Sequence, residues 1–190
     1  ARGFSVDEPD EHGRTPAHVA AEIGHCQIIR TLYEAGADFT RADNEGITPA
    51  HLVVWSGRIE GIRMLIAYGM NFNVADIHGY SPSIEAAAST DPTIVEALSD
   101  AGVDFNRYRD ADGWTAAILG TVSCKPAMVE ALHKAGADFT TADNQGLTPA
   151  HASVFMESPA MIAAVAATGA NMNARDDKGA TPAHLAAHSN

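Results

Sequence analysis

The chain has 190 residues, of which 46% are hydrophobic but only 6% aromatic, so small aliphatic side chains must supply most of the core. The formal net charge at pH 7 is −12, from 12 Lys and Arg against 24 Asp and Glu that form no block. A nucleic-acid partner is therefore not expected, because contacts to phosphates need clustered Lys and Arg. No run of apolar residues is long enough to predict membrane insertion.

Residues 1–9 match the end of a later segment. Gly3 to Asp10 aligns with Gly36 to Asp43, so we expect residues 1–9 to be the tail of a unit whose helices are missing. Repeat arrays normally finish in atypical caps with a polar outer face, and neither end of this chain has that character. We interpret the chain as a piece of a longer array. The alternative is a degenerate cap at each end.

Residues 10–34 predict a turn followed by two helices. Asp10-Glu-His-Gly13 is typical of a turn, because glycine is favoured where φ is positive. Thr15 is a good N-cap and Pro16 a good first helical residue, so a first helix is expected over 16–23. Apolar residues on a single stripe predict a second helix over about 26–34.

The turn and first helix recur along the whole chain. The stretch Asp43-Asn-Glu-Gly-Ile-Thr-Pro-Ala-His51 has counterparts, some close and some degenerate, at 10–18, 76–84, 110–118, 143–151 and 176–184. The turn glycines follow one another at steps of 33, 33, 34, 33 and 33 residues: Gly13, Gly46, Gly79, Gly113, Gly146 and Gly179. So regular a period predicts a solenoid of stacked units.

A second pattern closes each unit, for example Ala35-Gly-Ala-Asp-Phe39 and Ala135-Gly-Ala-Asp-Phe139. Together with D-x-x-G-x-T-P-x-H in the turn, this pattern resembles the ankyrin repeat over nearly the whole chain. The resemblance implies an all-α fold, an ankyrin-repeat solenoid of stacked helix-turn-helix units joined by β-hairpin-like loops. We expect a single array over 1–190, with units one to five at 10–42, 43–75, 76–109, 110–142 and 143–175 and a partial unit six at 176–190.

Units three and four depart from the pattern. Thr-Pro-x-His becomes Ser81-Pro-Ser-Ile84 in unit three and Thr115-Ala-Ala-Ile118 in unit four, and Arg107-Tyr-Arg-Asp110 contains an extra residue. In ankyrin repeats the histidine is structural and bonds the backbone of adjoining turns. We therefore expect the array to be least stable at the hairpin between these two units. The alternative is that the two isoleucines form an apolar substitute.

Neither a catalytic site nor a metal site is expected. The recurring Asp and His residues are scaffold residues, and neighbouring units hold them on the order of 10 Å apart, too far to share a zinc ion. His184 and His188 lie at i and i+4, a spacing that can bind zinc, but no third ligand is evident. We expect no enzyme activity, no metal and no cofactor.

Two cysteines, Cys26 and Cys124, occupy nearly equivalent places in units one and four. Stacking separates them by on the order of 25–30 Å, whereas a disulfide needs Cα atoms within about 7 Å. Both are expected to be free thiols, which suits a reducing compartment. No signal-peptide pattern opens the chain, so an intracellular, cytoplasmic protein is expected unless a leader has been removed.

Apolar residues occupy positions that the scaffold does not require. In the family, the residue after the turn glycine and the end of the first helix face the concave groove. The candidates for partner binding are Ile47, Trp55, Tyr80, Trp114, Leu147, Phe155 and Met156. Exposed apolar patches mark interaction sites, and Trp and Tyr are favoured in them. The alternative is that these side chains pack on each other and merely cover the inner helices.

The expected function is non-catalytic binding of another protein through the concave groove and the hairpin tips. Acidic residues near the groove favour a partner with an apolar anchor flanked by Lys or Arg. The alternative is a substrate-recruiting or regulatory arm of a larger enzyme or effector. The protein is expected to be monomeric apart from end-to-end association. Asn73 and Asn106 also resemble sites of asparaginyl hydroxylation in eukaryotic ankyrin repeats.

Overall fold

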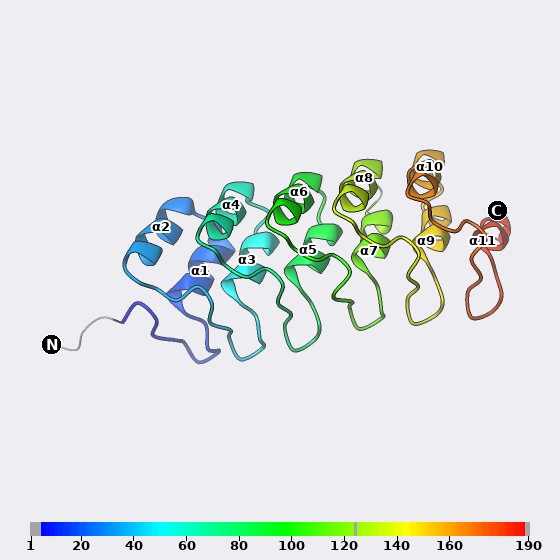
Figure 1. Cartoon of the computed structure of the whole chain (residues 1–190). Helices are drawn as coiled ribbons and strands as arrows, with labels where there is room; N and C mark the ends of the chain where they lie inside the picture. The colour runs from blue at the N-terminus through cyan, green and yellow to red at the C-terminus, as the bar shows by residue number, and fades with distance from the viewer. Residues whose placement is uncertain (1–4, 124, 189–190) are drawn as a thin grey trace.

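Short helices in two rows make up the structure (Figure 1). The computed structural model describes residues 5–123 and 125–188. Its helices are α1 (Pro16–Ile23), α2 (Cys26–Glu34), α3 (Pro49–Trp55), α4 (Ile59–Ala67), α5 (Pro82–Ala88), α6 (Pro92–Asp100), α7 (Ala116–Val122), α8 (Pro126–Lys134), α9 (Pro149–Phe155), α10 (Pro159–Ala167) and α11 (Pro182–His188). The odd-numbered helices form one row and the even-numbered helices α2 to α10 the other, with the turns projecting beside the odd row.

The arrangement confirms the all-α solenoid. Each odd-numbered helix contacts the next odd-numbered helix, each even-numbered helix contacts the next even-numbered one, and α1 packs on α2 as α3 packs on α4. The helices predicted over 16–23 and 26–34 form within those bounds. Among the described residues none is in a β-strand, so the hairpin-like loops are extended segments joined by turns.

The odd-numbered helices begin at the residue types that predict them. Thr15 is extended, with φ −93° and ψ 167°, and Pro16 is the first helical residue of α1, where its missing N–H breaks no helical bond. Gly24 ends α1 in the left-handed region at φ 66°. Thr48 and Thr148 begin α3 and α9 in the same way.

An aspartate and a glycine shape each turn. The carboxylate of Asp43 accepts hydrogen bonds from the N–H groups of Glu45 and Ile47, both at 2.9 Å. Asp43 N–H in turn donates to the carbonyl of Ile47 at 2.9 Å. Gly46 has φ 80°, and a Cβ added there would lie 3.1 Å from the backbone nitrogen of Ile77 in the next unit, so this position requires glycine. The turn therefore holds Ile47 in a fixed place.

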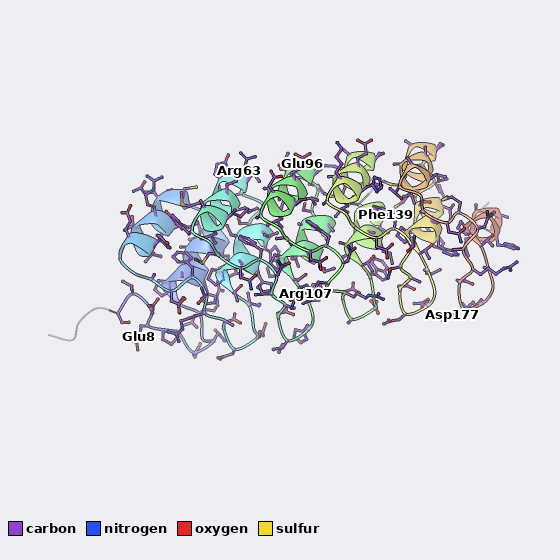
Figure 2. The ribbon with its side chains drawn as sticks, in the orientation of Figure 1. Glu8, Arg63, Glu96, Arg107, Phe139 and Asp177 are labelled. Carbon is purple, nitrogen blue, oxygen red and sulfur yellow. The ribbon has the colours of Figure 1, made fainter. Side chains whose placement is uncertain are left out.

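One phenylalanine per unit fills the core of units one to four. Phe39, Phe72, Phe105 and Phe139 recur at the period of the repeat, and none is more than 3% exposed. Figure 2 labels Phe139 inside the array. Met172, at the equivalent place in unit five, is half-buried against the same core. Each ring is covered by side chains of its neighbours, so burial of the core depends on stacking.

A buried histidine fastens each regular unit to the next. His51 is 4% exposed, and its Nδ1 accepts hydrogen bonds from the N–H and the hydroxyl of Thr48, at 3.1 and 2.9 Å. Because Nδ1 accepts, the ring proton is on Nε2, which donates to the carbonyl of Tyr80 in unit three at 3.3 Å. His18 and His151 make the same bond to the next turn, at 3.1 and 3.2 Å. The structural role expected of these histidines is confirmed.

These bonds require a neutral imidazole. Burial is the largest influence on the pKa of His18 and His51 and lowers both, with the hydrogen bond to the next turn acting in the opposite direction. Between the lowered folded-state pKa and the ordinary value of 6.5, the unfolded chain binds more protons than the folded chain. Lowering the pH through this window therefore favours unfolding.

We predict that stability falls as the pH is lowered through this window, and that His51→Ala costs about 2–4 kcal/mol at neutral pH through lost hydrogen bonds and a cavity. Urea unfolding followed by circular dichroism at about pH 7.5 and about pH 5.5 measures both effects. The variant should also depend less on pH, because one titrating group is gone. Equal wild-type midpoints at the two pH values would contradict the neutral-imidazole bond.

The turns of units three and four are less well connected. Ile84 replaces the histidine of unit three. Within the described residues no backbone hydrogen bond joins the turn of unit three to that of unit four, whereas every other pair of successive turns is joined by one of 3.0 to 3.2 Å. The segment with the extra residue supplies a different link, because the hydroxyl of Tyr108 donates to the carbonyl of Asn73 at 2.9 Å. The tails of units two and three are thus joined by a hydrogen bond, whereas the turns of units three and four share no backbone hydrogen bond among the described residues.

We predict that amides in the turns at 76–80 and 110–114 exchange faster with deuterium than those at 43–47, because local stability follows local connection. Hydrogen exchange followed by mass spectrometry measures this. Ser81→Thr combined with Ile84→His restores the regular sequence and should slow exchange at 110–114. Slowest exchange at this junction in the wild-type chain would contradict the prediction.

The face of unit one that points away from unit two exposes an apolar surface. Val19, Ile23 and Ile28 are 46%, 47% and 42% exposed, around a shallow hollow of about 570 Å³. Within the array, the equivalent faces of α3 and α5 are covered by the preceding unit. This is the face through which end-to-end association is expected.

Candidate functional site

The predicted binding residues come from two kinds of position beside the odd-numbered row (Figure 1). Trp55 and Phe155 are the last residues of α3 and α9. Ile47, Tyr80 and Leu147 follow the turn glycines. The backbone N–H of each donates to the carboxylate of the aspartate that opens its turn, and the N–H of that aspartate donates to the carbonyl of the same residue. We call the surface formed by the turns and the odd-numbered helices the inner face.

Three predicted residues come together between units two and three. Ile47, Trp55 and Tyr80 line a hollow of about 320 Å³, here called the Trp55 pocket. Trp55 is 68% exposed and Tyr80 41% exposed. The other walls of the pocket are Glu45, His51, Asp76 and Glu85. An aromatic surface and three carboxylates therefore share one small space.

Two further predicted residues meet between units five and six. Leu147 and Phe155 line a wider hollow of about 820 Å³, and Phe155 is 49% exposed. Charges of both signs surround it, since Asp177 and Lys178 belong to the same wall. Figure 2 shows Asp177 at the turn of the last unit. This hollow has less acidic character than the Trp55 pocket.

The remaining predicted residues, Trp114 and Met156, line neither of these two hollows. Trp114 is half-buried in the turn of unit four, where its backbone N–H donates to the carboxylate of Asp110 at 2.8 Å. Met156 is half-buried and packs against the core. These two side chains therefore offer a partner less surface than Trp55 does.

Glu85 was missed as a site residue, although the sequence carries a signal for it. It occupies the position directly after the histidine place in α5. The equivalent residue is apolar in every other unit: Val19, Leu52, Leu119, Ala152 and Leu185. Aligning the units position by position would have marked Glu85 as the exception. The prediction looked for apolar residues in polar places and did not look for the reverse.

The carboxyl group of Glu85 lies in an unfavourable environment. Its side chain is half-buried, and burial, followed by the nearby charge of Asp76, raises its pKa. The ion pairs in the described part of the chain involve Glu11 and Glu22, and Glu85 takes part in neither. Within the described residues, the carboxyl group of Glu85 therefore has no cationic partner in an ion pair.

We predict that Glu85→Leu raises the melting temperature at neutral pH. A folded-state pKa above the ordinary 4.5 means that the folded chain loses stability as the pH rises through that window, and leucine removes the cost. Differential scanning calorimetry measures the change. Glu96→Leu, on the exposed outer side of α6 (Figure 2), is the control and should change little. A lower melting temperature for Glu85→Leu would contradict the interpretation.

Metal ligands, membrane-spanning helices and cysteines were searched for in the described part of the chain. Among those residues, no three His, Cys, Asp or Glu side chains are placed to hold a metal ion, and no helix is long and apolar enough to cross a bilayer. His184 Nδ1 lies 2.7 Å from the hydroxyl of Thr181, while the side chain of His188 is outside the described residues. Cys26 is a free cysteine, and Cys124 is outside the described residues.

Asn73 and Asn106 both join neighbouring units. The amide of Asn73 donates to the carbonyl of Gly102 at 3.2 Å and accepts from the N–H of Asp104 at 2.8 Å. Asn106 makes the equivalent bonds to the next unit at 2.9 and 2.7 Å. Hydroxylation of either residue stays a prediction, and it would alter a side chain that stabilises stacking.

Known proteins share this architecture. A family model for ankyrin repeats, in three copies, matches residues 2–76 and 83–176. The chain belongs to the ankyrin-repeat family. Among solved structures it is similar to the crystal structure of the ankyrin repeat domain of Bcl-3, described as a unique member of the IkappaB protein family. The two share 28% sequence identity with a TM-score of 0.81, over 93% of this chain and 81% of the other.

Ankyrin repeats generally mediate protein–protein interactions and are typically non-catalytic, and the fit to the Bcl-3 domain agrees with that role. A search of curated protein sequences finds no match to this chain. In all, 554 solved chains match its fold, so the fold alone cannot select a partner. The partner has to be inferred from the inner face of this particular ankyrin array.

Proposed function

We propose that this ankyrin array binds a partner protein across its inner face, through the turn tips and the ends of the odd-numbered helices. The observation that carries the proposal is the exposure of Trp55, which is 68% exposed at the end of α3. A ring that only covered the inner helices would be mostly buried. Large aromatic side chains held open beside a hollow are typical of binding hot spots.

The charge of this face supports a basic partner. Glu45 and Asp112 lie at exposed positions in the turns, and Glu157 is exposed just beyond the end of α9. The chain as a whole has a formal net charge of −12. Complementary Lys or Arg on the partner would raise the rate of association, while an apolar anchor would supply much of the affinity. We propose a partner with an apolar anchor flanked by basic residues.

We predict that Trp55→Ala weakens binding by about 2 kcal/mol or more, roughly thirtyfold, because a central aromatic residue is lost from the interface. The partner is captured on the purified array, identified and purified, and its affinity is measured by titration calorimetry. Trp114→Ala tests the second tryptophan and should also weaken binding, with circular dichroism confirming that the array remains folded.

Glu96→Ala, on the outer side of α6, serves as the matched surface control and should bind normally (Figure 2). The proposal fails if Trp55→Ala binds the purified partner as tightly as the wild-type array does. It also fails if Glu96→Ala, rather than the tryptophan variants, abolishes binding, since that would place the interface on the opposite side.

A further inference from the structure

The Trp55 pocket contains negative charge without positive charge. Its walls include the carboxyl groups of Glu45, Asp76 and Glu85, and no Lys or Arg belongs to them. The indole of Trp55 and the phenol of Tyr80 form its aromatic side. A ligand that suits this pocket must satisfy a carboxylate and cover an aromatic ring together.

The three carboxylates are not equally available to a ligand. Asp76 already accepts hydrogen bonds from the N–H groups of His78 and Tyr80, both at 2.9 Å, and so stabilises its own turn. Glu45 is exposed at the rim. Glu85 is half-buried, makes no ion pair within the described residues, and replaces an apolar residue of the other units. Glu85 is therefore the acceptor that the ankyrin scaffold itself does not use.

The aromatic rings and the carboxylate of Glu85 together favour some partner side chains over others. An apolar anchor in this pocket would bury the charge of Glu85 further without pairing it, which costs free energy. An ammonium group would pair with Glu85 but has no flat surface to lie against an indole ring. A guanidinium group is planar, stacks on aromatic rings and donates several hydrogen bonds to a carboxylate. It meets both requirements of the pocket.

We propose that the Trp55 pocket binds an arginine side chain of the partner, with the guanidinium stacked on Trp55 and hydrogen-bonded to Glu85. The proposal rests on the proposed function and deepens it, because it assigns one basic residue of the partner to one pocket. The apolar anchor then belongs elsewhere on the inner face, where Leu147 and Phe155 line the wider hollow.

The repeat scaffold preorganises this pocket. His51 is one of its walls and also donates to the carbonyl of Tyr80, so one ring sets the distance between the walls from unit two and unit three. Pocket walls that are fixed before binding lose less conformational freedom on association. The pocket thus lies between units two and three, whose turns are joined by the histidine and by a backbone hydrogen bond. The neighbouring turns of units three and four have neither of these bonds among the described residues.

The test uses acetylated and amidated Gly-Gly-Arg-Gly-Gly and the same peptide with citrulline, which has nearly the same shape and no charge. Two-dimensional NMR follows the indole N–H signals, and the chain has two tryptophans, so Trp114 is an internal reference. We expect the arginine peptide to shift the Trp55 signal and leave Trp114 unmoved. Binding of the citrulline peptide should be at least about tenfold weaker, since it lacks the charge that Glu85 requires.

Variants at Glu85 complete the test. Glu85→Leu restores the residue type of the other units and should keep the fold while weakening arginine binding at least about tenfold. Glu85→Gln should weaken it similarly with minimal change in shape. A third peptide, with lysine in place of the arginine, tests whether charge alone suffices. The proposal is overturned if the citrulline or the lysine peptide binds as tightly as the arginine peptide, or if both variants bind the arginine peptide normally.

These results are separable from those that test the proposed function. If the purified partner needs Trp55 but arginine peptides leave its signal unmoved, the interface stands and the arginine pocket is wrong. If arginine peptides bind through Glu85 but the purified partner ignores Trp55, the pocket stands and the proposed interface with that partner is wrong.

Discussion

A neutral imidazole held between two turns is the interaction on which this array depends. The ring of His51 accepts from the helix cap of its own unit and donates to the backbone of the next unit. One side chain therefore stabilises the start of a helix, the shape of a turn and the stacking of two units. Because each unit buries its core only against neighbours, loss of such a connection affects a junction rather than a residue. Units three and four both have isoleucine in place of the histidine. Among the described residues the turns of units three and four share no backbone hydrogen bond, whereas Asn144 N–H of unit five still donates to the carbonyl of Asp112 in unit four at 3.2 Å.

The sequence was sufficient for most of the fold, because the features that build it are local and repeated. Thr15, Pro16 and Gly24 occupy the cap, first-turn and C-terminal positions expected of them, and the two helices of unit one end where predicted. The link made by Tyr108 could not be foreseen in the same way. It depends on the path of a chain segment with an extra residue, and the spacing of the other units says nothing about that path.

The site was less predictable than the fold. Periodicity indicates which side of a unit a residue occupies, but the exposure of its ring depends on the side chains in the adjoining units. Trp55 and Trp114 were both predicted to contact a partner, yet one is 68% exposed and the other is half-buried. Glu85 went unnoticed because its oddity is apparent only against the apolar residues at the same place in other units.

The central claim is that His51 is a neutral Nε2–H imidazole that fixes the wall of the Trp55 pocket to Tyr80. The direct measurement is long-range proton–nitrogen NMR of the histidine rings, which distinguishes the two neutral tautomers and the imidazolium. The account predicts that His51 has an unprotonated Nδ1 at neutral pH and is still mostly neutral at pH 6.5, the ordinary pKa of histidine, because burial lowers the pKa of His51. A ring protonated on Nδ1, or an imidazolium at that pH in the folded array, would contradict it.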